Sequence, residues 1–120
     1  MEFMENEMID EAIELMEKTY SSTLGWNYKV SKGSDITYPG LIFQNDSHGS
    51  VQQILVLIIP DCAYSQHHID NMGLWYRESR SKGVEIVQQY IVYPRGVSDL
   101  PQAHNIDFLF LDTFSCTISS

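Results

Sequence analysis

The spacing of hydrophobic positions predicts two helices in this chain. Apolar side chains return every three or four positions in residues 3–20 and again in residues 65–82, which is typical of helices with one buried face. Ser65 is a suitable N-cap for the second helix, and Gly83 follows its last turn. The apolar positions of the two stripes are Met4, Met8, Ala12, Leu15 and Met16, and then Ile69, Met72, Trp75 and Tyr76.

Five other segments have the alternation, or the β-branched and aromatic composition, of strands. The run from Ile54 to Ile59 is apolar on both faces, which predicts a central strand covered on both sides. Turn-forming residues at 46–49 precede this strand and predict an antiparallel hairpin with the strand before it. The predicted strands are residues 26–30, 35–45, 50–60, 84–94 and 106–114.

The order of these elements predicts an α/β fold. A helix lies between strands 50–60 and 84–94, so we expect a βαβ unit with parallel strands and a right-handed crossover. With the hairpin and the last strand, this unit gives a mixed sheet of four or five strands that carries helices on its faces. The length of 120 residues suits one domain, so residues 1–120 are expected to form a single α/β domain with an acidic amphipathic helix at its N-terminus.

Negative charge is concentrated in the predicted N-terminal helix. The net charge of the chain is −9, and residues 1–18 contain seven acids and one Lys. One interpretation is a solvated helix face. The other is a surface on which Glu7, Glu11 and Glu14 bind a basic protein partner, such as a toxin or a nucleic-acid enzyme. Three aromatic residues are candidate anchors for that partner if they are exposed: Trp26, Tyr28 and Tyr38.

Composition restricts the class of protein further. With 43% hydrophobic and 19% charged residues, the chain can bury a core. No apolar run approaches the roughly 20 residues of a membrane helix, and no basic segment followed by an apolar one opens the chain. We therefore expect a cytoplasmic protein without a membrane span. Direct binding to nucleic acid is disfavoured because phosphate contacts need clustered Lys and Arg. The two cysteines have no zinc-site spacing and are expected to be reduced, and no cofactor is expected.

The segment DCAYSQHH, residues 61–68, holds the candidate chemistry. It follows the apolar strand, and functional groups in open α/β sheets collect beyond the carboxyl ends of parallel strands. If Asp35 lies near Asp61 at the open end of the hairpin, these two carboxylates and His67 or His68 could bind Mg²⁺ or Mn²⁺. In the alternative interpretation, Asp61 is a turn residue after Pro60 and the histidines begin a surface helix.

The order helix, strand, antiparallel hairpin, helix, strand over residues 3–93 resembles the core of restriction-endonuclease-like nucleases of the PD-(D/E)xK type. In that family an acid on the first helix, an Asp early in the hairpin and a Glu-x-Lys on its second strand bind a metal and activate water. Asp35 in GSDITYPGLIF matches the Asp, whereas residues 58–60 read Ile-Ile-Pro and leave Asp61 as the nearby acid. The resemblance implies a nuclease-like fold without the catalytic residues or, alternatively, a metal-dependent nuclease that uses Asp35 and Asp61.

A second, local resemblance concerns ILVLIIPDCAYSQ, the helix after it and KGVEIVQQYIVYP. These segments resemble a thioredoxin-type strand, a Cys-x-x-Ser variant of the redox motif, its helix and the following parallel strand. The resemblance implies a nucleophilic thiolate at Cys62. The other interpretation is a small, semi-buried cysteine at a strand end.

Together these patterns favour a small acidic binding protein over an enzyme. It would resemble immunity proteins, antitoxins or phage-type inhibitors, and would engage a basic protein partner on a nuclease-like fold without catalytic residues. A metal-dependent nuclease and a thioredoxin-like thiol protein are the alternatives.

Overall fold

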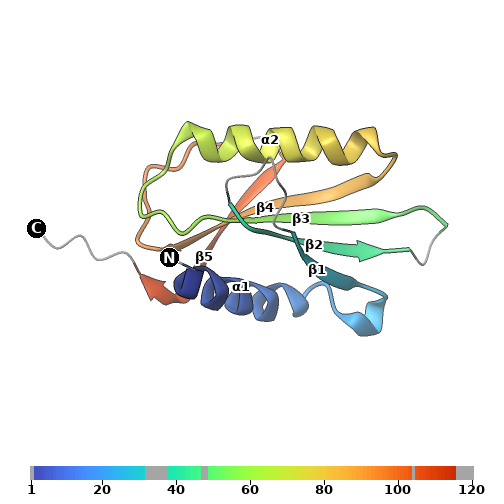
Figure 1. Ribbon diagram of the computed structural model, residues 1–120, viewed down its shortest axis with the longest axis horizontal. Helices are drawn as coiled ribbons and strands as arrows, with labels where there is room; N and C mark the ends of the chain where they lie inside the picture. The colour runs from blue at the N-terminus through green and yellow to red at the C-terminus, as the bar shows by residue number, and fades with distance from the viewer. Residues whose placement is uncertain (1, 32–37, 47–48, 104, 116–120) are drawn as a thin grey trace, which may run out of the picture.

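The computed structural model describes residues 2–31, 38–46, 49–103 and 105–115. Within these ranges the chain forms two α-helices, a short 3-10 helix and five strands, so the predicted α/β class is confirmed (Figure 1). The elements are α1 Glu2–Glu17, η1 Ser22–Leu24, β1 Asn27–Ser31, β2 Gly40–Asn45, β3 Gln52–Ile58, α2 Gln66–Ser81, β4 Glu85–Arg95 and β5 Ile106–Ser115. In this part of the chain, neither helix is long and apolar enough to cross a membrane.

The five strands form one mixed sheet in the order β1-β2-β3-β4-β5. β2 pairs antiparallel with β1 and with β3, and the hairpin register places Gly40 opposite Leu57. β3 and β4 are parallel and are connected through α2, and β5 is parallel to β4. The predicted hairpin and the parallel βαβ unit are therefore confirmed. The strand predicted over 35–45 begins at Gly40 in the structure, and residues 35–37 lie outside the described residues.

The two helices cover opposite faces of the sheet (Figure 1). α1 packs Met8 and Met16 against one face, and α2 packs Met72 and Trp75 against the other. β3 lies between them, and its residues 53–58 are buried, as predicted for a central apolar strand. Each fully buried aliphatic or aromatic side chain contributes about 1.5–3 kcal/mol, so these two layers supply most of the driving force for folding.

A close approach between α2 and β2 depends on the absence of a side chain at Gly40. A Cβ atom at this position would lie 2.6 Å from the ring of Trp75, well inside van der Waals contact. The glycine lets Trp75 lie directly on the β2 backbone, which fixes the distance of α2 from the sheet. This contact therefore positions the middle of α2 over β2.

Candidate functional site

Four polar side chains form a connected network where the ends of β3 and β4 meet the start of α2. The Nε2 atom of His68 lies 3.0 Å from Asp61 Oδ2, and its Nδ1 atom lies 2.8 Å from the Tyr93 hydroxyl oxygen. The Tyr38 hydroxyl donates a hydrogen bond of 2.8 Å to the same Asp61 oxygen. We call these four residues, Tyr38, Asp61, His68 and Tyr93, the Asp61 network. They come from four separate segments, so only the tertiary fold brings them together.

The local sequence builds this network from a strand end and a helix start. β3 ends at Ile58, and Pro60 lacks the N–H that would continue its ladder. Ser65 has the extended backbone of an N-cap, and its hydroxyl accepts the His67 N–H at 3.2 Å. The Ser65 N–H in turn donates to Nδ1 of His68 at 3.4 Å, so His68 fills the role of Glu or Gln in a capping box. This capping buries His68, which is 1% exposed, and leaves its neighbour exposed.

The hydrogen bonds of His68 assign a role to each of its ring nitrogens. Its Nδ1 atom faces two donors, the Ser65 N–H and the Tyr93 hydroxyl, so Nδ1 accepts and the ring proton lies on Nε2. The Nε2–H group then donates to Asp61. Burial raises the pKa of Tyr93 above its usual range. Burial, followed by the hydrogen bond to Asp61, raises the pKa of Tyr38 to about 12.

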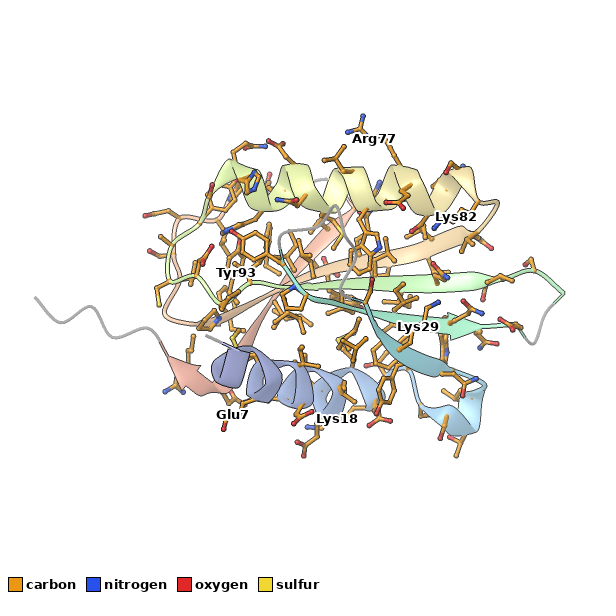
Figure 2. All side chains as sticks on the ribbon, viewed as in Figure 1. Glu7, Lys18, Lys29, Arg77, Lys82 and Tyr93 are labelled. Carbon is orange, nitrogen blue, oxygen red and sulfur yellow. The ribbon has the colours of Figure 1, made fainter. Side chains whose placement is uncertain are left out.

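This arrangement is suited to holding structure rather than to transferring protons to a bound molecule. His68 and Tyr93 are both buried, and Figure 2 shows Tyr93 between the sheet and α2. Asp61 is 47% exposed, but two donors already occupy its Oδ2 atom. Among the described residues, no buried side-chain nitrogen or oxygen lacks a partner. The network therefore satisfies its own buried hydrogen bonds without a ligand.

The predicted divalent-metal site does not assemble within the described residues. In those ranges, no three His, Cys, Asp or Glu side chains are grouped so that they could hold a metal ion. Asp35 lies outside the described residues, and the exposed ring of His67 packs edge-on against Tyr38, with centroids 6.4 Å apart. The metal-dependent nuclease with Asp35 and Asp61 thus stays a prediction.

Cys62, the candidate nucleophile of the thiol alternative, is exposed and disulfide-bonded. The expectation of a reduced thiol is wrong for this residue, because its sulfur already has a covalent partner. Cys116 lies outside the described residues. Since the thiolate is the nucleophilic form of cysteine, a redox role would first require reduction of Cys62, and the thiol alternative stays a prediction.

The outer face of α1 carries exposed carboxylates, as the sequence predicted. Glu7 and Glu14 are both exposed, and Figure 2 shows Glu7 pointing away from the sheet. Neither Glu7 nor Glu14 forms an ion pair with a described residue. Glu11 differs from its neighbours, because it is partly buried and its Oε2 atom accepts the backbone N–H of Asp112 at 2.8 Å. One of the three predicted partner-binding acids therefore connects α1 to β5.

The three candidate aromatic anchors have different surroundings. Trp26 is partly buried and packs edge-on against a neighbouring tyrosine, with ring centroids 5.2 Å apart. Tyr38 is also partly buried, and its hydroxyl is bound to Asp61. Tyr28 on β1 is 46% exposed and lies beside Phe43 of β2, with centroids 5.7 Å apart. Of the three, Tyr28 is the one with the exposure that an anchor requires.

From the sequence, His68 was a candidate metal ligand or part of a surface helix start, and Tyr93 had no predicted role. The surface position is wrong for His68, which is buried against the sheet. A signal for His68 existed in the Ser-x-x-His spacing from Ser65, because a side chain at the third helical position can accept the N-cap N–H. No local signal existed for Tyr93, whose hydroxyl reaches the site only through the parallel pairing of β3 and β4.

Comparisons with protein-family models, with curated proteins and with solved structures give no match to this chain. The resemblances to restriction-endonuclease-like and thioredoxin-like proteins accordingly stay predictions. Function has to be inferred from the surfaces and the site themselves.

Proposed function

We propose that this protein is a small acidic binding protein, of the kind represented by immunity proteins, antitoxins and phage-type inhibitors, and that it engages a basic protein partner. The observation that carries the proposal is the outer face of α1. There Glu7 and Glu14 are exposed, and neither forms an ion pair with a described residue. Their charge is therefore available to a partner rather than neutralised within the molecule.

Several observations support this proposal. A row of carboxylates on one helix can imitate phosphates and accelerate the encounter with a basic cleft. In the Asp61 network, in contrast, His68 and Tyr93 are buried and their hydrogen bonds are satisfied. The order of elements from α1 to β4 also agrees with the order that the nuclease resemblance implies. At the position of its Glu-x-Lys, residues 58–60 include two fully buried isoleucines.

Site-specific photo-cross-linking from α1 can identify the partner. A photoreactive amino acid replaces Glu14 in one variant and Arg77 in a control, because Figure 2 shows Arg77 pointing outward from α2 on the other layer. In a lysate of the organism that makes the protein, position 14 is expected to capture a protein with a basic isoelectric point that position 77 does not. Capture of the same proteins from both positions would contradict a specific surface on α1.

Charge reversal then tests the role of the carboxylates with the purified partner. Glu7→Lys combined with Glu14→Lys is expected to weaken binding by about tenfold or more, since close interfacial charge pairs couple by roughly 1.5 kcal/mol or more. Asp70→Lys with Glu78→Lys is the matched control, because it changes the net charge equally but on exposed positions of α2. An equal loss in both double variants would attribute binding to net charge alone, and no loss in either would leave α1 as a solvated face.

The nuclease alternative has an independent readout. Mg²⁺- or Mn²⁺-dependent cleavage of DNA or RNA by the purified protein, abolished in Asp61→Ala, would establish an enzyme and remove the inhibitor proposal. The cytoplasmic location stays a prediction, and the disulfide at Cys62 is unusual for that compartment.

A further inference from the structure

The two edges of the sheet are protected to different degrees. α1 packs against β5, and the Glu11 carboxylate accepts the N–H of Asp112 on that strand. The β4–β5 register also shifts between Pro94 and Arg95, which interrupts a regular edge. β1 forms the other edge, and no described strand pairs with its outer side. Since natural proteins usually cover or interrupt their sheet edges, the open side of β1 has the character of an interaction surface.

The side chains of β1 leave an apolar face unfinished at this edge. Tyr28 lies opposite Phe43, and Val30 lies opposite Leu41. Phe43 and Leu41 belong to the buried core beneath α1, whereas Tyr28 and Val30 are 46% and 43% exposed. The apolar face therefore continues past the last covered strand. The side chains of one additional strand would cover the open flank of both residues, at about 25 cal/mol for each Å² removed from water.

The negative charge near β1 indicates which kind of peptide segment would bind this edge. Residues 7–31, which span most of α1, η1 and β1, contain five acids and two Lys. A basic segment is therefore complementary to this side of the molecule. A second copy of the chain fits less well. Antiparallel pairing of β1 with itself about its central residue would set Lys29 against Lys29 and bring two acidic helices together.

We propose that an extended segment of a basic protein adds to the outer edge of β1 as a further strand of the sheet. This inference rests on the proposed function for the basic character of the partner, and it adds how that partner docks. Backbone hydrogen bonds along Asn27–Ser31 set the register of the added strand. Its apolar side chains cover Tyr28 and Val30, and Lys or Arg side chains at its ends lie near the carboxylates of α1.

A designed peptide probe tests strand addition on the wild-type protein. The peptide Lys-Lys-Val-Thr-Val-Thr-Val-Lys-Lys has one apolar side and basic ends. In a strand, the N–H groups of alternate residues point to opposite sides, so methylating the backbone nitrogens of either the valines or the threonines blocks one side only. Affinity is measured by two-dimensional NMR titration, and hydrogen exchange of the amides of residues 27–31 is followed in the complex.

Strand addition predicts a difference between the two methylated peptides. One of them should bind about tenfold or more weakly than the unmethylated peptide, because it loses the hydrogen bonds to the edge, and the other should bind nearly as well. Amides of β1 should exchange more slowly in the complex. Equal affinities of the two methylated peptides, or unchanged exchange in β1 at saturation, would overturn strand addition.

Further peptide experiments distinguish a failure of strand addition from a failure of the proposed function. If both methylated peptides bind equally but Glu7→Lys with Glu14→Lys abolishes binding, the acidic surface stands and strand addition falls. A peptide with Glu in place of Lys that binds equally well through β1 would overturn the basic partner instead. Slow exchange of β1 amides without peptide, together with a dimer in analytical ultracentrifugation, would assign the edge to a second copy and overturn this occupant.

Discussion

The hydrogen bond between Tyr93 and His68 provides a direct test of the Asp61 network as a structural element. Tyr93→Phe removes the hydroxyl and keeps the buried ring. His68 Nδ1 then retains only the Ser65 N–H, whose separation of 3.4 Å marks a weak bond, in place of the hydroxyl at 2.8 Å. Both partners are buried, so water cannot replace the lost donor.

The expected cost follows from these distances and from burial. A buried acceptor that loses its partner costs about 1–3 kcal/mol, and the remaining Ser65 contact reduces that penalty, so we expect Tyr93→Phe to lower the free energy of unfolding by about 1–2 kcal/mol. Urea denaturation followed by tryptophan fluorescence measures this change. Tyr64→Phe is the control, because its hydroxyl donates to Gln66 at an exposed position, and its removal should cost less than about 0.5 kcal/mol.

A double-mutant cycle identifies the source of the effect. His68→Leu combined with Tyr93→Phe replaces both partners by apolar groups, so the double variant should be more stable than the sum of the two single losses predicts, by about 1 kcal/mol. A Tyr93→Phe variant that matches Tyr64→Phe in stability, or a cycle without coupling, would refute the reasoning that this network holds β3, α2 and β4 together.

Three further predictions address other parts of the molecule. Tyr38→Phe removes a hydroxyl whose pKa is raised from the usual 10 to about 12 in the folded protein. The contribution of this hydroxyl to stability is complete below pH 10 and is lost as the pH rises toward 12. In alkaline denaturation, the variant should therefore lose stability less steeply than the wild type over this pH range. Gly40→Ala should destabilise the fold by about 1–3 kcal/mol, because its Cβ would lie 2.6 Å from the ring of Trp75. Gly73→Ala, which has open space around its Cβ, should instead stabilise α2 by about 1 kcal/mol. Thermal denaturation of both variants measures the two changes, and equal effects would contradict the packing argument. Alkylation of the native protein should modify Cys62 only after treatment with a reductant, and modification without reductant, located by peptide mass mapping, would contradict the disulfide.

The sequence by itself determined the layers of this fold, because local periodicity reports burial directly. The stripe with Met8 and Met16, the stripe with Met72 and Trp75, and the unbroken apolar run of β3 predicted two helices on opposite faces of a central strand. The turn at 46–49 predicted the hairpin. The concentration of acids in α1 also followed from the sequence alone, because residues that are close in sequence stay close in space when they form one helix.

Only the tertiary structure determined which polar residues are buried and which of them form hydrogen bonds with one another. The spacing from Ser65 makes His68 a capping residue, but only the packing of α2 on the sheet buries its ring and leaves His67 exposed. Asp61 accepts a hydrogen bond from Tyr38 of the segment before β2, and Tyr93 of β4 reaches the site through its hydrogen bond to His68, so no spacing in the sequence could identify these two tyrosines. The same reason applies to the two sheet edges. Strand order decides that β5 is partly covered by α1 and that β1 is open, because an edge is defined by the neighbours that a strand lacks.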